Sequence, residues 1–299
     1  MATDFETLLY KTDASVATIT LNRPEQLNTI VPPMPDELEA AIGLAERDPT
    51  VKVIVLRGAG RSFCGGYDFG GGFQKWGGPM NTDGRWDPGK DFAVVSSRET
   101  GPTPKFMAIW RASKPVIAQV HGWCVGGGSD YALCADLVIA SDDAVIGTPY
   151  ARMWGAYLTG MWLYRLSLAK VKWHSLTGEP LTGKEAAAIE LINESVPFER
   201  LEARVAEVAA KLSRIPLSQL QAQKLIVNQA YENMGLASTQ TLGGILDGLM
   251  RNTPDALTFI DTANTEGVRA AVQRRDGPWG DYSQAPSDRR PDPTHVIEP

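Results

Sequence analysis

The stretch that most constrains the fold is residues 116–130, VIAQVHGWCVGGGSD. Its first five residues are mostly apolar and β-branched, as in a strand that is buried on both faces. Glycines 126–128 follow, and because they carry no Cβ, the backbone there can turn sharply and lie directly against a ligand. A helix that opens after them places these glycines at its N-terminal end, where unpaired N–H groups favour an anion. This pattern predicts a strand that leads through a glycine turn into a helix, with a candidate functional site at the turn.

A second stretch of the same kind lies upstream. Residues 52–57, KVIVLR, are typical of a strand, and they lead into GAGRSFCGGYDF, where two glycines precede Tyr67 and Asp68. Two such turns can supply two backbone N–H groups to one oxygen atom, which stabilises a developing oxyanion. Asp130 stands in the first turn of the expected helix, close to the same pocket. The alternative is that these are ordinary tight turns and that Asp130 only complements the helix dipole.

Four blocks along the chain resemble the crotonase (enoyl-CoA hydratase/isomerase) superfamily. They are LNRPEQLNTI (21–30), RSFCGGYDF (61–69), KPVIAQVHGWCVGGGSDYALCADLVIAS (114–141) and LTGEPLTGKEAAAIELINESVP (176–197). The resemblance implies a crotonase-like α/β fold, a ββα spiral core with a C-terminal helical trimerisation region. It also implies an acyl-CoA thioester as substrate, whose thioester oxygen is held by the backbone N–H groups of Tyr67 and Gly127.

Two positions depart from the pattern of the hydratases in this family. Asp130 stands where they usually carry glutamate, and Tyr150, twenty positions later, stands where they typically carry a second glutamate. Hydration of a 2-enoyl thioester requires one group that deprotonates water and an acid that protonates the α-carbon. A tyrosine, with an ordinary pKa of about 10, is a poor base at neutral pH but a good hydrogen-bond donor. Only one carboxylate is therefore evident at this site from the sequence.

Three functions remain open on this basis. We favour lyase chemistry, an enoyl-CoA hydratase-like hydration or dehydration through a CoA-thioester enolate, in which Asp130 is the acid/base and Tyr150 orients water or the acyl group. An enoyl-CoA isomerase or a β-keto C–C hydrolase can use Asp130 alone. The third alternative is a non-catalytic homologue that binds acyl-CoA without turnover.

The resemblance also nominates residues that contact the substrate. They come from the loop after the first hairpin, the two glycine turns, the segment after Tyr150 and a late helix: Arg23, Gln26, Leu27, Gly66, Asp68, Gly126, Arg152, Trp154 and Phe259. Arg152 can bind a second carboxylate or carbonyl of the substrate, or it can pair with a local acid. Arg274 and Arg275 are further nominated for covering CoA.

The resemblance also implies how the chain is divided. We expect a spiral core over residues 1–200, a C-terminal helical subdomain over 201–282, and an extended or disordered tail over 283–299. Within the core, residues 70–103 contain a stretch rich in Gly, Pro, Asn and Asp, which is typical of a loop. The resemblance implies an insertion that shapes the acyl pocket, and the alternative is a surface insertion packed by its own aromatic side chains. Single helices are predicted over residues 92–111, 155–166 and 254–274.

Composition limits the partners. A net charge of −6 and a pI near 5.2 argue against nonspecific nucleic-acid binding. The chain has no apolar run of membrane-spanning length, and its three cysteines have neither metal-ligand nor disulfide spacing. We therefore expect a cytoplasmic enzyme with no membrane partner, no metal and no cofactor besides the coenzyme A of its substrate. The family resemblance implies a homotrimer or a dimer of trimers.

Overall fold

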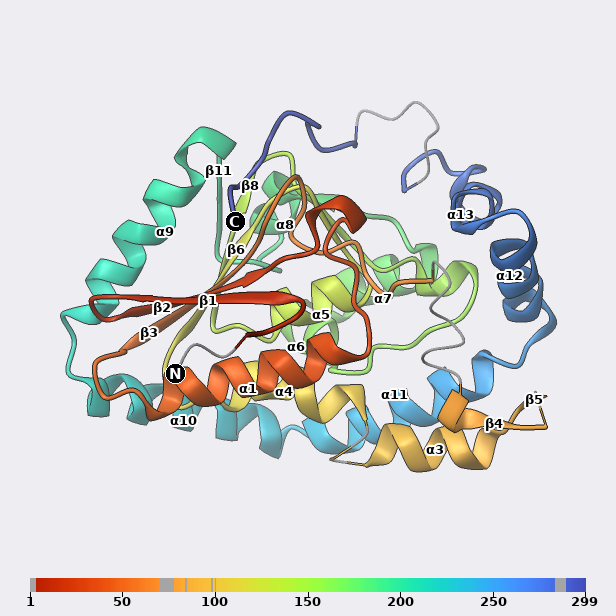
Figure 1. The fold of residues 1–299 in the computed structure, drawn as a ribbon, viewed down its shortest axis with the longest axis horizontal. Helices are drawn as coiled ribbons and strands as arrows, with labels where there is room; N and C mark the ends of the chain where they lie inside the picture. The colour runs from red at the N-terminus through yellow and green to blue at the C-terminus, as the bar shows by residue number, and fades with distance from the viewer. Residues whose placement is uncertain (1–3, 70–77, 84, 98, 100, 283–288) are drawn as a thin grey trace.

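A six-stranded sheet organises the computed structural model, which describes residues 4–69, 78–83, 85–97, 99, 101–282 and 289–299 (Figure 1). The first two strands form an antiparallel hairpin, and every later pairing in this sheet is parallel. In spatial order the strands are β1 (Leu8–Asp13), β2 (Val16–Leu21), β3 (Val53–Gly58), β6 (Val116–Val120), β8 (Leu137–Ser141) and β11 (Glu194–Val196). Strand β6 is buried at every position, as its apolar sequence predicts.

Smaller sheets extend the core. One is the three-stranded sheet of β7 (Trp123–Val125), β9 (Val145–Gly147) and β10 (Leu181–Thr182), and another is the hairpin of β4 (Asn81–Thr82) and β5 (Arg85–Trp86). The chain passes from β6 to β7 through Gly122, whose φ is +58° and where a Cβ would lie 2.0 Å from the carbonyl oxygen of Arg61. Only glycine fits this corner.

Helices cover both faces of the large sheet (Figure 1). On one face α9 (Phe198–Ser213) packs through its buried stripe of Leu201, Val205 and Ala209. Helices α1 (Pro33–Arg47) and α4 (Pro102–Arg111) belong to the larger core on the other face. Along β3 the side chains alternate between these two cores, because successive residues of a strand point to opposite faces.

The remaining helices surround the end of the sheet where the glycine turns lie or form the C-terminal region. They are α3 (Pro88–Ser96), α5 (Gly127–Leu133), α6 (Met161–Arg165), α7 (Leu168–Thr177), α8 (Gly183–Ala188), α10 (Leu217–Asn233), α11 (Leu236–Met250), α12 (Pro254–Thr265) and α13 (Val268–Asp276). Three short 3-10 helices complete the set: η1 (Pro24–Gln26), η2 (Gly78–Met80) and η3 (Pro149–Arg152).

Three of the long helices predicted from sequence are wrong in extent. The helix expected over residues 92–111 is two helices, α3 and α4, and α4 begins at Pro102 after an extended Gly101. Only α6 exists within residues 155–166, because Gly155 and Gly160 have φ of +134° and +76°. The helix expected over 254–274 breaks at Gly267, whose φ is +94°. In each case a glycine or a proline interrupts the helix, although the apolar residues continue at helical spacing.

The end of the chain lies against the core. Ile297 exchanges two backbone hydrogen bonds with Gly60, at 2.7 and 2.8 Å, and its side chain is buried. His295 stacks on Phe198 of α9 with ring centroids 4.1 Å apart. The described part of this segment, residues 289–299, has a turn at residues 293–294 and an isolated bridge at Ile297, and residues 283–288 lie outside the described part of the chain.

Candidate active site

The two glycine turns lie side by side, as the sequence predicts. Cys64 donates from its N–H to the carbonyl of Trp123 at 2.9 Å and accepts from Val125 N–H at 3.0 Å, which forms a parallel bridge. Gly66 follows with a φ of +96°, and a Cβ there would lie 2.9 Å from the carbonyl oxygen of Val125. The close approach of the two backbones therefore requires glycine at this position.

Hydrogen bonds between Ile30 and the first turn orient the backbone at Tyr67. Ile30 donates to the carbonyl of Gly66 at 2.8 Å and accepts from Asp68 N–H at 3.0 Å. Both bonds of this bridge go to the neighbours of Tyr67, so the N–H of Tyr67 points away from Ile30, to the side on which the second turn lies. Gly127 is the first residue of α5, where an N–H has no acceptor within the helix.

Asp130 is the buried acid of the site. It is 1% exposed, and it accepts hydrogen bonds from Thr159 Oγ1 at Oδ1 and from the Tyr150 hydroxyl at Oδ2, the latter at 3.3 Å. Burial raises the pKa of Asp130 from its ordinary value to about 7, while the two hydroxyl hydrogen bonds act in the opposite direction. The carboxyl group is therefore balanced between its neutral and ionised forms near neutral pH.

Tyr150 stands between Asp130 and the cavity. It belongs to η3, and its ring packs edge-on against Tyr157 at 5.6 Å. A Cβ at Gly155 would lie 2.4 Å from the ring of Tyr150, so that glycine leaves room for the tyrosine. Burial, together with the negative charge of Asp130, raises the pKa of Tyr150 well above its usual value. The hydroxyl consequently stays protonated and donates to Asp130.

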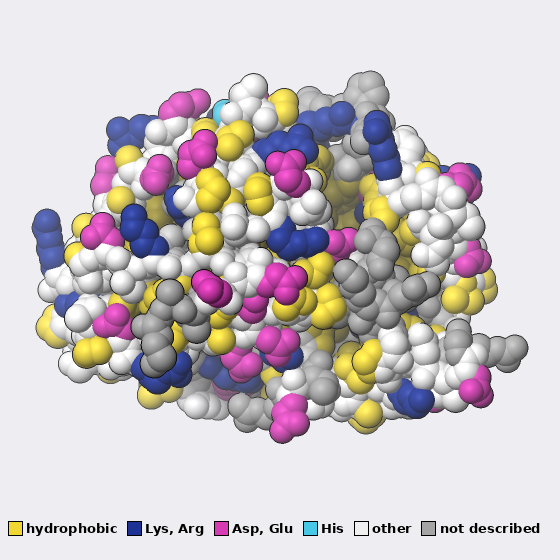
Figure 2. Space-filling model, in the orientation of Figure 1, with side chains coloured by type: hydrophobic (Ala, Val, Ile, Leu, Met, Phe, Trp, Pro, Cys, Tyr) yellow, Lys and Arg dark blue, Asp and Glu magenta, His cyan; other side chains and the backbone are white. Residues whose placement is uncertain are grey.

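A cavity of about 1140 Å³ opens over the glycine turns. Much of its wall is apolar or aromatic: Leu27, Phe69, Met80, Trp86, Val94, Val95, Met153, Trp154 and Leu158. Figure 2 shows a hollow on this face with hydrophobic side chains inside it and Lys or Arg side chains at its edge. Arginines that line the cavity are Arg61, Arg251, Arg269, Arg275 and Arg290. Such a cavity fits a long ligand with an apolar part and an anionic part.

Most residues nominated from the sequence line this cavity. They are Gln26, Leu27, Gly66, Tyr67, Asp68, Gly126, Tyr150 and Trp154. Asp130 and Gly127 are not among the described residues that line the cavity. Each is next to a residue that does line it: Asp130 accepts a hydrogen bond from Tyr150, and Gly127 follows Gly126 in the chain. Asp130 is therefore one hydrogen bond away from the cavity surface.

Arg23 and Phe259 have supporting positions. Arg23 donates to Asp68 at 2.9 Å and to the carbonyl of Thr29, so it fixes the turn that precedes the cavity wall. Phe259 is 7% exposed and packs edge-on against Trp154, with centroids 5.7 Å apart. The guanidinium of Arg275, which lines the cavity, lies over the Phe259 ring at 5.5 Å. Arg274, the other basic residue nominated for CoA, pairs with Glu266 instead.

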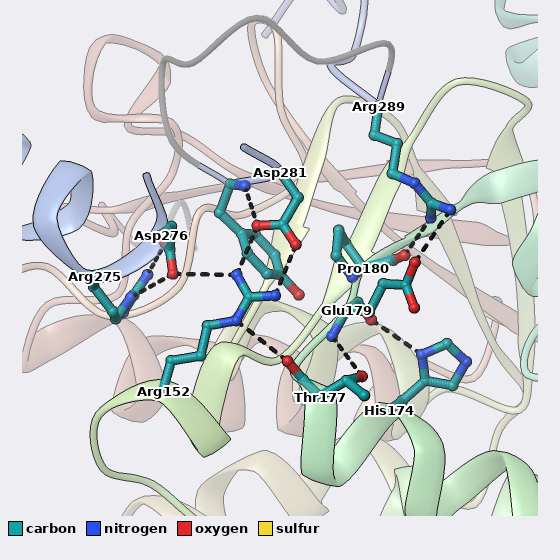
Figure 3. Close-up of polar contacts among 10 residues, drawn as sticks. Arg152, His174, Thr177, Glu179, Pro180, Arg275, Asp276, Asp281 and Arg289 are labelled. Carbon is teal, nitrogen blue, oxygen red and sulfur yellow. Dashed lines mark hydrogen bonds and ion pairs between the residues drawn. The ribbon is translucent and has the colours of Figure 1, made fainter. Parts of the chain in front are cut away.

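Arg152 is not among the described residues that line the cavity. Figure 3 shows the polar contacts that it makes instead. Its guanidinium, 3% exposed, makes a bidentate ion pair with Asp281 at 2.6 and 2.7 Å and lies 3.5 Å from Asp276. It also stacks over the ring of Trp279 at 4.5 Å. Arg152 thus ties η3, which carries Tyr150, to the C-terminal segment. The local ion pair, the alternative considered from the sequence, is the arrangement present.

Three functional positions were missed from the sequence. Thr159 binds Asp130, and it is held by Gln240 Nε2, which donates to its carbonyl at 2.9 Å. Asp247 and Arg251 of α11 line the cavity wall. No local motif marks any of them, and the helical spacing of Asp247 and Arg251, four residues apart, was the one available signal.

The described residues contain no group of three or more His, Cys, Asp or Glu side chains placed to hold a metal ion. None of the helices in the described part of the chain is both long and apolar enough to cross a membrane.

The parallel-rich sheet, the paired glycine turns and the buried acid beside a large cavity define an α/β enzyme of the crotonase class. The chain belongs to the enoyl-CoA hydratase/isomerase family, whose sequence model matches residues 11–281. It is similar to a solved enoyl-CoA hydratase from Mycobacterium smegmatis, with 38% identity, a TM-score of 0.87 and coverage of 96% of this chain and 99% of that one.

Two further relatives agree with this assignment. A solved enoyl-CoA hydratase/isomerase from Xanthobacter autotrophicus Py2 is 31% identical, with a TM-score of 0.79 over 92% of this chain and 98% of that one. The (E)-benzylidenesuccinyl-CoA hydratase of Thauera aromatica is 31% identical over 87% of this chain and 93% of its own. Enoyl-CoA hydratase/isomerase chemistry on a CoA thioester is therefore the class of activity to which this enzyme belongs.

Proposed function

We propose that this protein is a lyase that adds water to, or removes it from, the α–β bond of an acyl-CoA thioester through an enolate. The observation that carries the proposal is the Asp130–Tyr150 pair, placed beside two convergent glycine turns and opening on the cavity. A carboxyl group with a pKa near 7 can both donate and accept a proton at neutral pH, which is what an enolate mechanism requires.

In the hydration direction, the oxygen of water bonds to the β-carbon and the π electrons move toward the thioester. Negative charge develops on the thioester oxygen, where the N–H groups of Tyr67 and Gly127 stabilise it. One such donor contributes on the order of 10²–10³ in rate. The attacking water loses one proton, which a base takes up and passes on to solvent. The α-carbon takes a proton from the Tyr150 hydroxyl, Asp130 returns a proton to Tyr150, and solvent reprotonates Asp130. Dehydration runs the same steps in reverse.

The CoA portion of the substrate is assigned to the polar parts of the cavity. Gln26 and Leu27, with Leu27 in the left-handed region at a φ of +52°, form the wall beside the first glycine turn. Arg61, Arg269, Arg275 and Arg290 line the cavity and can neutralise phosphate groups. Phe259 supports this role indirectly, since it holds the guanidinium of Arg275.

The C-terminal helices support the proposal of a homotrimer or a dimer of trimers. Exposed large apolar side chains concentrate on α10 and α11: Leu225, Ile226, Val227, Leu242, Ile245, Leu246, Leu249 and Met250. Apolar surface of this kind marks a protein–protein contact. With no membrane-spanning helix among the described residues, we keep the cytoplasm as the proposed location.

The test is deuterium incorporation at the α-carbon of a small panel of acyl-CoA esters in D₂O, followed by mass spectrometry. We expect exchange with the native enzyme and none with Asp130→Asn. The product mass then distinguishes water addition from the two alternatives, an isomerised double bond or a cleaved β-keto ester. Tight binding of the esters without exchange would support a non-catalytic acyl-CoA-binding protein and contradict the proposal.

A further inference from the structure

A second carboxylate lines the cavity from an element that carries no family motif. Asp247, on α11, is 5% exposed and belongs to the cavity wall. Arg251, one helical turn later, donates to its Oδ2 and also to Asp91 Oδ1 of α3 at 2.7 Å. Oδ1 of Asp247 makes no hydrogen bond within the described part of the chain.

The cluster contains two carboxyl groups and one cationic group. Two carboxylates, Asp91 and Asp247, share the single guanidinium of Arg251, and only Asp247 and Arg251 reach the cavity. Within this cluster, the buried carboxylate oxygen without a hydrogen-bond partner among the described residues is Asp91 Oδ2, and Asp91 does not line the cavity. Asp247 does line it, so its carboxylate can accept a hydrogen bond from a water molecule or from a hydroxyl group of a ligand.

Helix α11 brings this carboxylate toward the reacting centre. At successive turns the helix contacts the segment that carries Asp130's partner: Gln240 binds the carbonyl of Thr159, and a Cβ at Gly243 would lie 2.8 Å from the carbonyl oxygen of Tyr157. Asp247 follows Gly243 by four residues and so lies on the same face of the helix.

The negative charge of Asp247 affects the pKa values of other residues of the site. Burial is the main cause of the raised pKa values of Tyr67, Tyr150 and Asp130, and the negative charge of Asp247 adds to all three. Such effects fall off with distance, so Asp247 lies in the same electrostatic neighbourhood as these residues.

We propose that Asp247 is the second catalytic carboxylate of the site, the base that takes a proton from the attacking water. It would perform, from α11, the task that a glutamate at position 150 performs in other hydratases. This inference rests on the proposed function.

The proton balance of the reaction is then complete. As water bonds to the β-carbon, one O–H bond breaks and its proton moves to Asp247, while the α-carbon gains the proton held by Tyr150 and Asp130. Asp247 has gained one proton and Asp130 has lost one, and exchange with solvent restores both. Arg251 is a positioning residue in this scheme, since it holds the Asp247 carboxylate in place.

The test compares Asp247→Asn with the matched variant Asp91→Asn. Both substitutions remove a carboxyl group that Arg251 binds, but Asp91 does not line the cavity. Two rates are measured for each: hydration of an enoyl-CoA, and α-proton exchange of a saturated acyl-CoA in D₂O, which needs no attacking water.

We expect Asp247→Asn to lower the hydration rate by about 10²–10⁴, the usual contribution of a general base, and to leave α-proton exchange within a few-fold of native. Asp91→Asn should lower hydration by much less. Hydration that persists in Asp247→Asn would overturn the inference, as would equal losses in the two variants or loss of exchange together with hydration. Absence of exchange in the native enzyme would instead contradict the proposed function itself.

Discussion

Two aspartates of this cavity have contrasting surroundings. Asp130 is surrounded by neutral donors, the hydroxyls of Thr159 and Tyr150, and burial dominates its titration. Asp247 forms an ion pair with Arg251 and lies on the cavity wall. The same side chain is thus held as a proton-sharing acid in one place and as a paired carboxylate in the other, and only the neighbours differ.

This contrast explains how an enzyme of the family can function with tyrosine at position 150. Tyr150 does not replace a carboxylate as a base, because its raised pKa keeps it protonated. It extends the reach of Asp130, which does not itself line the described cavity wall. In the mechanism that we propose, the base for water is Asp247 on the cavity wall.

The largest expected effect is on catalysis by Asp130. Asp130→Asn keeps the shape of the side chain but cannot exchange a proton, so α-proton exchange should fall by about 10³ or more. The measurement is the rate of deuterium uptake by an acyl-CoA, with binding of the same ester as the control. A variant that binds normally and exchanges at the native rate would remove Asp130 from the mechanism.

The same variant should gain stability at high pH. Because the folded state raises the pKa of Asp130 from 3.8 to about 7, its contribution to stability is complete at low pH and is lost as the pH rises through 7. Each pKa unit corresponds to about 1.4 kcal/mol. Denaturant unfolding should therefore find Asp130→Asn more stable than the native protein at pH 8, by a few kcal/mol, and not at pH 4. Equal differences at both pH values would mean that Asp130 is not held in an apolar environment.

Loss of the Tyr150 hydroxyl should have a smaller effect than loss of Asp130. Tyr150→Phe retains the ring that packs against Tyr157 but removes the group that connects Asp130 with the cavity. We expect α-proton exchange to fall by about 10²-fold, with little change in the affinity for a saturated acyl-CoA. If Tyr150→Phe exchanged as fast as the native enzyme, Asp130 would reach the substrate directly.

The smallest effect concerns Thr159. Its hydrogen bond favours the ionised form of Asp130, so Thr159→Val should raise the pKa of Asp130 further. The pH profile of α-proton exchange should move to higher pH, while the maximal rate changes little. A matched control is Thr148→Val, which removes a hydroxyl that contacts Tyr157 and not Asp130. A shift of the same size in both variants would rule out a specific role for Thr159.

Local patterns in the sequence predicted the parts of the site that are contiguous in the chain. The strands before both glycine turns, the turns themselves and Asp130 follow from residues 52–68 and 116–130, because buried strands and tight turns leave distinct signals. The long helices were overextended wherever glycine or proline interrupted an apolar pattern.

The remaining parts depend on contacts between distant segments. Thr159 reaches Asp130 from a loop, and Asp247 and Arg251 reach the cavity from α11, more than a hundred residues after the glycine turns. A single threonine, or an Asp–Arg pair on a helix, is common on exposed surfaces, so the sequence alone does not show that the fold buries it. Arg152 is the opposite case: its position in the sequence indicated a substrate contact, but in the fold its guanidinium forms an ion pair with Asp281.

The most direct test of the account is the pH dependence of α-proton exchange in the native enzyme, measured with a saturated acyl-CoA that cannot be hydrated. Exchange needs the ionised form of Asp130 as the ultimate acceptor, so the account predicts a rate that rises with pH and has its midpoint at about 7. The rise should be absent in Asp130→Asn. A midpoint near the ordinary aspartate value of about 4, or a rise that survives in Asp130→Asn, would show that another group takes the proton and would contradict the assignment of Asp130.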